Sequence, residues 1–202
     1  MTSHSEPLYS DGDIEMKDLN DDEIEDIREA VEHTRAEAVH SGRKTLPEFQ
    51  PPHSFEAADR NFEAAPILLV VDTNFAISHL KIIDELVALQ GDFGYLIVVP
   101  TTVVRELDGL KKDNGPWSRT QSNKNSDVAV YARQAIRWLF RALAVSHPAV
   151  RPQRLDERHS DKDMAADDSI LDCCWYFQKN RDKPVCLLSG DYNLCIKALA
   201  NG

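Results

Sequence analysis

The chain has 202 residues, of which 42% are hydrophobic and 28% charged, a composition that suits one globular domain with a tail. We expect a soluble intracellular protein, because no apolar run approaches the roughly 18 residues of a membrane span and no basic-then-apolar signal region begins the chain. Its four cysteines form neither a CxxC pair nor a zinc spacing with histidine, which excludes those metal sites.

The formal net charge of −11 lies almost entirely near the N-terminus. Residues 1–40 hold 13 acidic and 3 basic side chains, a net of −10, which leaves −1 for residues 41–202. The rest of the chain is therefore compatible with a polyanionic ligand. We predict an acidic, largely disordered tail over residues 1–65, with a marginal helix at 21–40 that needs a partner surface. A Pro-rich linker follows, which Phe62 and other large apolar side chains pin to the domain.

From residue 66 onward, strands alternate with helices. Five apolar residues at 67–71 predict a strand buried on both faces, and Ile77, Leu80 and Ile83 then recur at helical spacing. The later segments are predicted in order as a strand at 95–99, a helix from 101, a polar loop at 111–127, a helix at 126–144, a short edge strand at 150–155, a helix at 165–178, a strand at 184–188 and a helix from 191. This alternation predicts an α/β fold, a three-layer α/β/α domain with a central parallel sheet over residues 66–202.

Four carboxylates fall near the points where strands give way to helices. Asp72 ends the first strand, Glu106 lies about two turns past the second, Asp167 heads the core-facing stripe of its helix, and Asp191 follows the last strand. Each also has a simpler interpretation, because aspartates cap or stabilise helix N-termini and Glu106 could belong to a solvated helix face. All four nevertheless map to the carboxyl edge of one parallel sheet, where such sheets bind ligands.

Carboxylates brought together at one edge predict a metal site. They repel one another unless they share a cation. A ligand set of oxygens without histidine or cysteine favours Mg²⁺ or Mn²⁺, as one or two ions. Carboxylate-held ions of this kind commonly hydrolyse phosphodiesters.

The residues around these acids resemble the motifs of PIN-domain ribonucleases. The matching stretches are Val-Val-Asp72-Thr73-Asn74-Phe, Arg-Glu106-Leu-Asp108-Gly109-Leu, Asp167-Asp168-Ser-Ile-Leu and Leu-Leu-Ser189-Gly190-Asp191-Tyr. The Glu-Leu-Asp-Gly-Leu stretch is similar to two eukaryotic branches, the endonuclease of nonsense-mediated decay and the nuclear endonuclease that clears faulty transcripts. The Asp-Thr-Asn-Phe-x-Ile-Ser-His-Leu run is closer to the second. The sequence departs from the family pattern in two ways. Ser189 supplies the hydroxyl that is usually that of a Thr. The chain also stops before the usual fifth strand, which predicts either a fragment or an exposed sheet edge.

The resemblance implies a divalent-metal-dependent endoribonuclease that cleaves single-stranded RNA. It implies a role in mRNA quality control, in the nucleus or else in the cytoplasm. It assigns metal binding to a set of acids and a supporting role to two polar side chains. The acids are Asp72, Glu106, Asp167 and Asp191, with Asp168 as a second register for Asp167, and the supporting residues are Asn74 and Ser189.

Basic residues next to the second predicted helix suggest where RNA binds. The loop at 111–127 combines Trp117 with Lys111, Lys112, Arg119 and Lys124, a composition suited to stacking and phosphate contacts with single strands. On the following helix, Arg133, Arg137 and Arg141 recur at four-residue spacing, which we interpret as a solvated basic face.

Two other functions fit parts of the sequence. A catalytically inactive PIN-like module could bind RNA or protein, but such modules typically lose acids that this chain keeps. An aspartyl phosphatase with Asp72 as nucleophile would need a second acid where Asn74 stands. For the acidic N-terminal segment, we consider a helix that binds a protein partner, a solubility tail, and a brake that competes with RNA.

Overall fold

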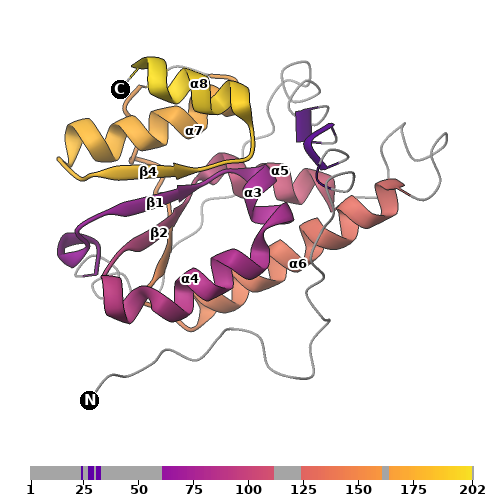
Figure 1. Ribbon diagram of the computed structural model, residues 1–202, viewed down its shortest axis with the longest axis horizontal. Coiled ribbons are helices and arrows are strands. Elements are labelled where there is room, and N and C mark those ends of the chain that lie inside the picture. Colours follow the sequence, from indigo (N-terminus) through magenta and orange to yellow (C-terminus); the bar gives the residue numbers. More distant parts are fainter. Residues whose placement is uncertain are drawn as a thin grey trace.

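The computed structural model of the chain describes residues 24, 27–29, 31–32, 61–111, 124–160 and 164–201, with the side chains of the helix at 124–144 described from residue 128. Within these ranges, four strands form one parallel sheet in the order β3-β2-β1-β4 (Figure 1). The strands are β1 (Leu68–Val71), β2 (Leu96–Val99), β3 (Val150–Pro152) and β4 (Val185–Leu188). Every residue of β1 and β2 is buried, as expected for apolar runs in a sheet covered on both faces.

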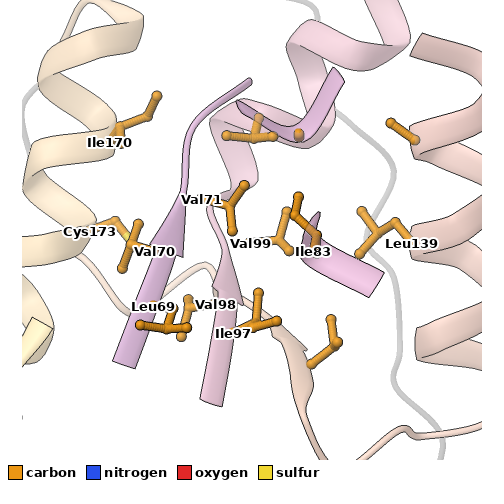
Figure 2. Close-up of a cluster of buried hydrophobic side chains, with 14 of the residues drawn as sticks. Leu69, Val70, Val71, Ile83, Ile97, Val98, Val99, Leu139, Ile170 and Cys173 are labelled. Atoms are coloured by element: carbon orange, nitrogen blue, oxygen red, sulfur yellow. The ribbon is translucent and has the colours of Figure 1, made fainter. Parts of the chain in front are cut away.

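Helices cover both faces of this sheet (Figure 1). One face carries α3 (Thr73–Ser78), α4 (Leu80–Phe93), α5 (Thr101–Leu110) and α6 (Lys124–Ala144), and the other carries α7 (Ala166–Trp175) and α8 (Tyr192–Asn201). In Figure 2, Val70 of β1 points toward Ile170 and Cys173 of α7, whereas Val71 points toward Ile83 and Leu139 on the opposite side. The predicted three-layer α/β/α fold is therefore confirmed. None of the helices in the described ranges has the length and apolar content to cross a membrane.

Several predicted elements differ from the structure in extent. The predicted helix at 165–178 is α7 followed by a π-helical segment, Tyr176–Asn180, and α6 begins at Lys124, inside the predicted loop. The helical spacing of Ile77, Leu80 and Ile83 continues across His79, but the backbone there leaves the helical region (φ −129°, ψ 33°) and separates α3 from α4. At this bend the His79 ring stacks on Phe75, with the ring centroids 4.7 Å apart. The edge strand β3 ends at residue 152, three residues before the predicted end.

The N-terminal segment contributes to the same core. Residues 24, 27–29, 31 and 32 are helical, and Ile27 and Val31 are buried in one cluster with the side chains of the sheet. These two apolar side chains of the predicted marginal helix thus pack on the domain itself. Phe62 is also buried, with the guanidinium carbons of Arg151 and Arg181 at 4.9 and 4.8 Å from its ring centroid. It lies in a short helical segment, residues 61–64, whereas residues 44–60 of the predicted linker lie outside the described residues.

Candidate active site

Asp72 lies where β1 ends and is fully buried, with 0% of its surface exposed. Its backbone N–H donates to the Leu188 carbonyl at 3.0 Å, which extends the pairing of β1 with β4. One carboxylate oxygen, Oδ1, accepts from the Thr73 N–H at 2.6 Å and caps α3. The other, Oδ2, accepts from the Ser189 hydroxyl at 2.9 Å. The capping interpretation is thus confirmed, but it accounts for only one of the two oxygens.

Thr73 joins this carboxylate to α5. It is buried, and its hydroxyl donates to Glu106 Oε2. Glu106 is buried as well, beside the inward-facing Leu107, so the solvated-face interpretation of this residue is wrong. The link runs between the start of α3 and the middle of α5, two segments that the parallel sheet brings to the same edge.

Ser189 joins Asp72 to the last helix. While its hydroxyl donates to Asp72, the same oxygen accepts from the Asp191 N–H at 2.9 Å. Asp191 is buried and caps α8, because its Oδ1 accepts from the N–H groups of Asn193 and Leu194 at 2.8 and 3.2 Å. Thr73 therefore links Asp72 to Glu106, and the Ser189 hydroxyl links the Asp72 carboxylate to the backbone N–H of Asp191; we call these linked residues the three-acid network.

Asp167 and Asp168 form a second acidic pair at the start of α7. Both bind the Lys197 ammonium of α8, with Nζ at 3.3 Å from Asp167 Oδ2 and 3.2 Å from Asp168 Oδ1. Burial alone would lower the pKa of Lys197, but the hydrogen bonds and charges of Asp168 and Asp167 outweigh burial and raise it. The side chain of Asp167 is 20% exposed and that of Asp168 is 48% exposed. Asp167 is therefore the more enclosed of the two aspartates predicted for this metal-binding position.

Sequence reasoning missed Lys197. No strong signal marked it, because Lys197 is 44% exposed, as most lysines are, and its partners Asp167 and Asp168 stand 30 and 29 residues away in the chain.

Asn74 is the least satisfied polar group near Asp72. Its side chain is 5% exposed, and neither its amide nitrogen nor its carbonyl oxygen has a hydrogen-bond partner among the described residues. A buried polar group left unpaired costs about 1–3 kcal/mol and commonly indicates an ordered water or ion. The predicted supporting role of Asn74 is consistent with these two unpaired polar atoms.

Cys195 reports the electrostatics of the site. Burial, and then the negative charges of Asp191 and Asp72, raise the pKa of its thiol. The sulfur lies 3.9 Å from the Ser189 carbonyl oxygen. The two acids thus act on one neighbouring group, as expected if they lie on one wall of the site.

The donor chemistry of these residues suits a hard divalent cation, but the described residues do not form a preassembled cage. Among them, no three His, Cys, Asp or Glu side chains are close enough together to hold a metal ion. Mg²⁺ does not require such a cage, because it keeps several waters and commonly binds through one or two carboxylates plus a substrate phosphate. The unpaired amide of Asn74 and the all-oxygen acids are compatible with that mode of binding.

The predicted RNA contacts fall mostly outside the described residues. Lys112, Trp117 and Arg119 lie outside them, as does the side chain of Lys124, the first residue of α6. The Lys111 ammonium pairs with Asp108. The role of this loop in binding RNA therefore stays a prediction.

Comparison with known proteins identifies the family of the domain. The sequence profile described as "PIN domain" matches residues 69–202, from β1 through α8. Transcriptional protein SWT1 of Saccharomyces cerevisiae is 37% identical over 196 residues, which cover 94% of this chain and 41% of that protein. Transcriptional protein swt1 of Schizosaccharomyces pombe is 40% identical over 133 residues, covering 65% of this chain and 26% of that protein. Telomerase-binding protein EST1A of Danio rerio is 28% identical over 221 residues, covering 94% of this chain and 14% of that protein. The chain thus spans less than half the length of each of these relatives.

Proposed function

The chain belongs to the PIN domain family, and from that premise we propose that it is a divalent-metal-dependent endoribonuclease that cleaves single-stranded RNA. The observation that carries the proposal is the three-acid network, in which Thr73 links Asp72 to Glu106 and the Ser189 hydroxyl links Asp72 to the Asp191 backbone. Helix capping accounts for Asp72 and Asp191 but not for the buried Glu106, which Thr73 holds at the edge where α/β sheets bind ligands.

Each residue of the network has a definite task in this proposal. Asp72, Glu106 and Asp191, with Asp167 or Asp168, would hold Mg²⁺ or Mn²⁺, as one or two ions. When bound, the ion supplies charge neutralisation at the scissile phosphate and lowers the pKa of a water. Ser189 and Thr73 orient the carboxylates of Asp72 and Glu106 by donating to them. The amide of Asn74 orients a water or a phosphate oxygen. Hydrolysis at this site leaves a 5′-phosphate and a 3′-hydroxyl.

The names of the relatives support a proposed cellular role. The two fungal proteins are named as transcriptional proteins, which supports a role near transcription, and we propose mRNA quality control in the nucleus. The PIN domain covers only part of those proteins, so targeting of particular transcripts would depend on other segments. Whether residues 21–40 also bind a protein partner stays a prediction.

One observation favours the alternative, a PIN-like module that binds RNA without cleaving it. No metal-holding group of three acids, histidines or cysteines is preassembled within the described ranges, and Lys197 pairs with both Asp167 and Asp168. In that case the acids would serve only as helix caps and ion-pair partners.

One assay separates the two functions. A circular single-stranded RNA has no ends, so only an endonuclease can linearise it. We expect the wild-type chain with Mn²⁺ to linearise the circle and Asp72→Asn to lose that activity, while Asp156→Asn, an exposed aspartate outside the site, retains it. Equal cleavage by wild type and Asp72→Asn would indicate a contaminating nuclease. RNA binding without cleavage by the wild type would establish the binding module instead.

A further inference from the structure

The outward face of α6 has an unusual charge composition. In a chain with a formal net charge of −11, residues 128–144 contain three arginines and no aspartate or glutamate. Solvated helix faces usually mix both signs, because pairs of opposite charge one turn apart stabilise the helix. The one acid of α6 is Asp127, near the start of the helix, and none lies one turn from Arg133, Arg137 or Arg141, so this side of the helix is suited to an anionic ligand.

An aromatic side chain lies among these arginines. Phe140 is 73% exposed and Arg137, one turn before it, is exposed as well. At about 100° per residue, Arg133, Arg137 and Phe140 fall within roughly 60° of arc on one side of the helix. One exposed phenylalanine is ordinary on a protein surface, but a ring next to guanidinium groups is the combination with which proteins bind single-stranded nucleic acid by stacking and phosphate contact.

The structure fixes which side of α6 faces outward. Ala132, Ala135 and Ala142 are buried against the rest of the domain. Trp138 donates its indole N–H to Asp84 Oδ1 of α4 at 2.8 Å, which prevents rotation of the helix about its axis. The side that carries Phe140 is thus held toward solvent.

The same helix is fixed to the candidate active site. It packs against α3 and α5, the helices that carry Thr73 and Glu106. Arg133 donates from Nη1 to the Lys111 carbonyl at 3.2 Å, at the C-terminal end of α5. From Arg133 to Phe140 the helix rises about 10 Å, the length of about three stacked nucleotides at 3.4 Å each.

We propose that Arg133, Arg137 and Phe140 form a binding track for the single-stranded RNA that flanks the cleavage site. The arginines contact phosphates and the Phe140 ring stacks on a base. The relation of the track to cleavage rests on the proposed function, but its binding of RNA does not. Single-stranded RNA is the occupant that fits, because the track combines positive charge with an exposed ring.

The test measures binding without cleavage. A fluorescent single-stranded RNA of about 12 nucleotides is titrated with the full chain in EDTA, by anisotropy, at several KCl concentrations. We expect Arg137→Gln to lower the slope of log K against log salt by about 0.7, the contribution of one phosphate contact on a single strand. We expect Phe140→Ala to weaken binding roughly 5- to 150-fold with little change in slope, and to leave binding of a blunt RNA duplex unchanged.

Matched controls separate the track from general effects. Arg158→Gln removes the same charge from an exposed site between β3 and α7, and Leu155→Ala truncates an apolar side chain that is equally exposed at 73%. Neither should alter RNA binding. Unchanged affinity and slope in both Arg137→Gln and Phe140→Ala would overturn the proposal. The acidic residues 1–40 of the same chain would then be the next candidate ligand of these arginines. Loss of binding in a protein that proves unable to cleave would retain the track and reject the nuclease, so the two proposals can fail separately.

Discussion

Replacing Ser189 with alanine tests whether the three-acid network is a working unit. The hydroxyl of Ser189 makes two contacts, donating to Asp72 Oδ2 and accepting from the Asp191 N–H, each at 2.9 Å. Ser189→Ala removes both contacts at once and adds no new atoms. Ser189→Thr retains the hydroxyl and is therefore the matched control.

The expected cost can be estimated from the two lost bonds. A hydrogen bond to a charged group contributes about 1.5–3 kcal/mol and a neutral one about 0.5–1.5 kcal/mol. Because Ser189 is only partly buried, water can replace some of this, so we expect Ser189→Ala to lower the free energy of unfolding by about 2–3 kcal/mol. For a chain of this size, such a loss corresponds to a fall in Tm of about 4–12 °C.

Urea denaturation of four proteins provides the measurement: wild type, Ser189→Ala, Asp72→Asn and the double variant. Asparagine caps a helix about as well as aspartate, so Asp72→Asn removes the charge while retaining the cap of α3. If Ser189 acts through the Asp72 carboxylate, Ser189→Ala should cost less in the Asp72→Asn background, with a coupling of about 1 kcal/mol or more. Additive effects, or a Ser189→Ala variant as stable as wild type, would refute the network.

Two further predictions concern the rim of the site. Lys197→Met should lower the free energy of unfolding of the metal-free protein slightly, by less than about 1 kcal/mol, because the pair is partly exposed. It should also enlarge the rise in Tm that Mn²⁺ produces, whereas Lys197→Arg should behave as wild type. An unchanged Mn²⁺ effect in Lys197→Met would mean that Asp167 and Asp168 do not meet the ion. Alkylation of Cys195 by iodoacetamide should require a higher pH than alkylation of the exposed Cys186, because burial and then Asp191 and Asp72 raise the pKa of the Cys195 thiol. Asp191→Asn should shift the pH dependence of Cys195 alkylation, followed by mass spectrometry of the two peptides, to lower pH. The absence of that shift would mean that Asp191 does not act on Cys195.

The sequence sufficed to predict the order of the elements because the determinants are local. Short apolar runs produced the buried strands β1 and β2 and the edge strand β4, which is only partly buried, and the alternation with helices implied a parallel sheet. The bend at His79 could not be predicted in this way, since Ile77 and Leu80 keep helical spacing on either side of it. The stacking of His79 on Phe75 depends on side-chain rotamers that periodicity does not encode.

The position of the candidate site followed from topology, but its connections did not. The parallel sheet explains why Asp72 and Asp191 start helices at the same edge. It does not determine that Thr73 reaches Glu106, 33 residues away, or that Ser189 reaches Asp72, 117 residues away. These links depend on the direction of single hydroxyl groups, which only the packed structure specifies.

The acids of the site are compensated in two different ways, and this suggests where a cation would compete. Asp72 and Glu106 receive hydrogen bonds from the neutral Ser189 and Thr73 hydroxyls, which can be retained when a cation approaches because they carry no charge to oppose it. Asp167 and Asp168 are paired with the Lys197 ammonium, and a divalent cation close to Asp167 would repel that charge. A cation entering the site would therefore leave the three-acid network in place and displace Lys197 toward solvent. The lysine is 44% exposed, so water can take over its solvation at little cost.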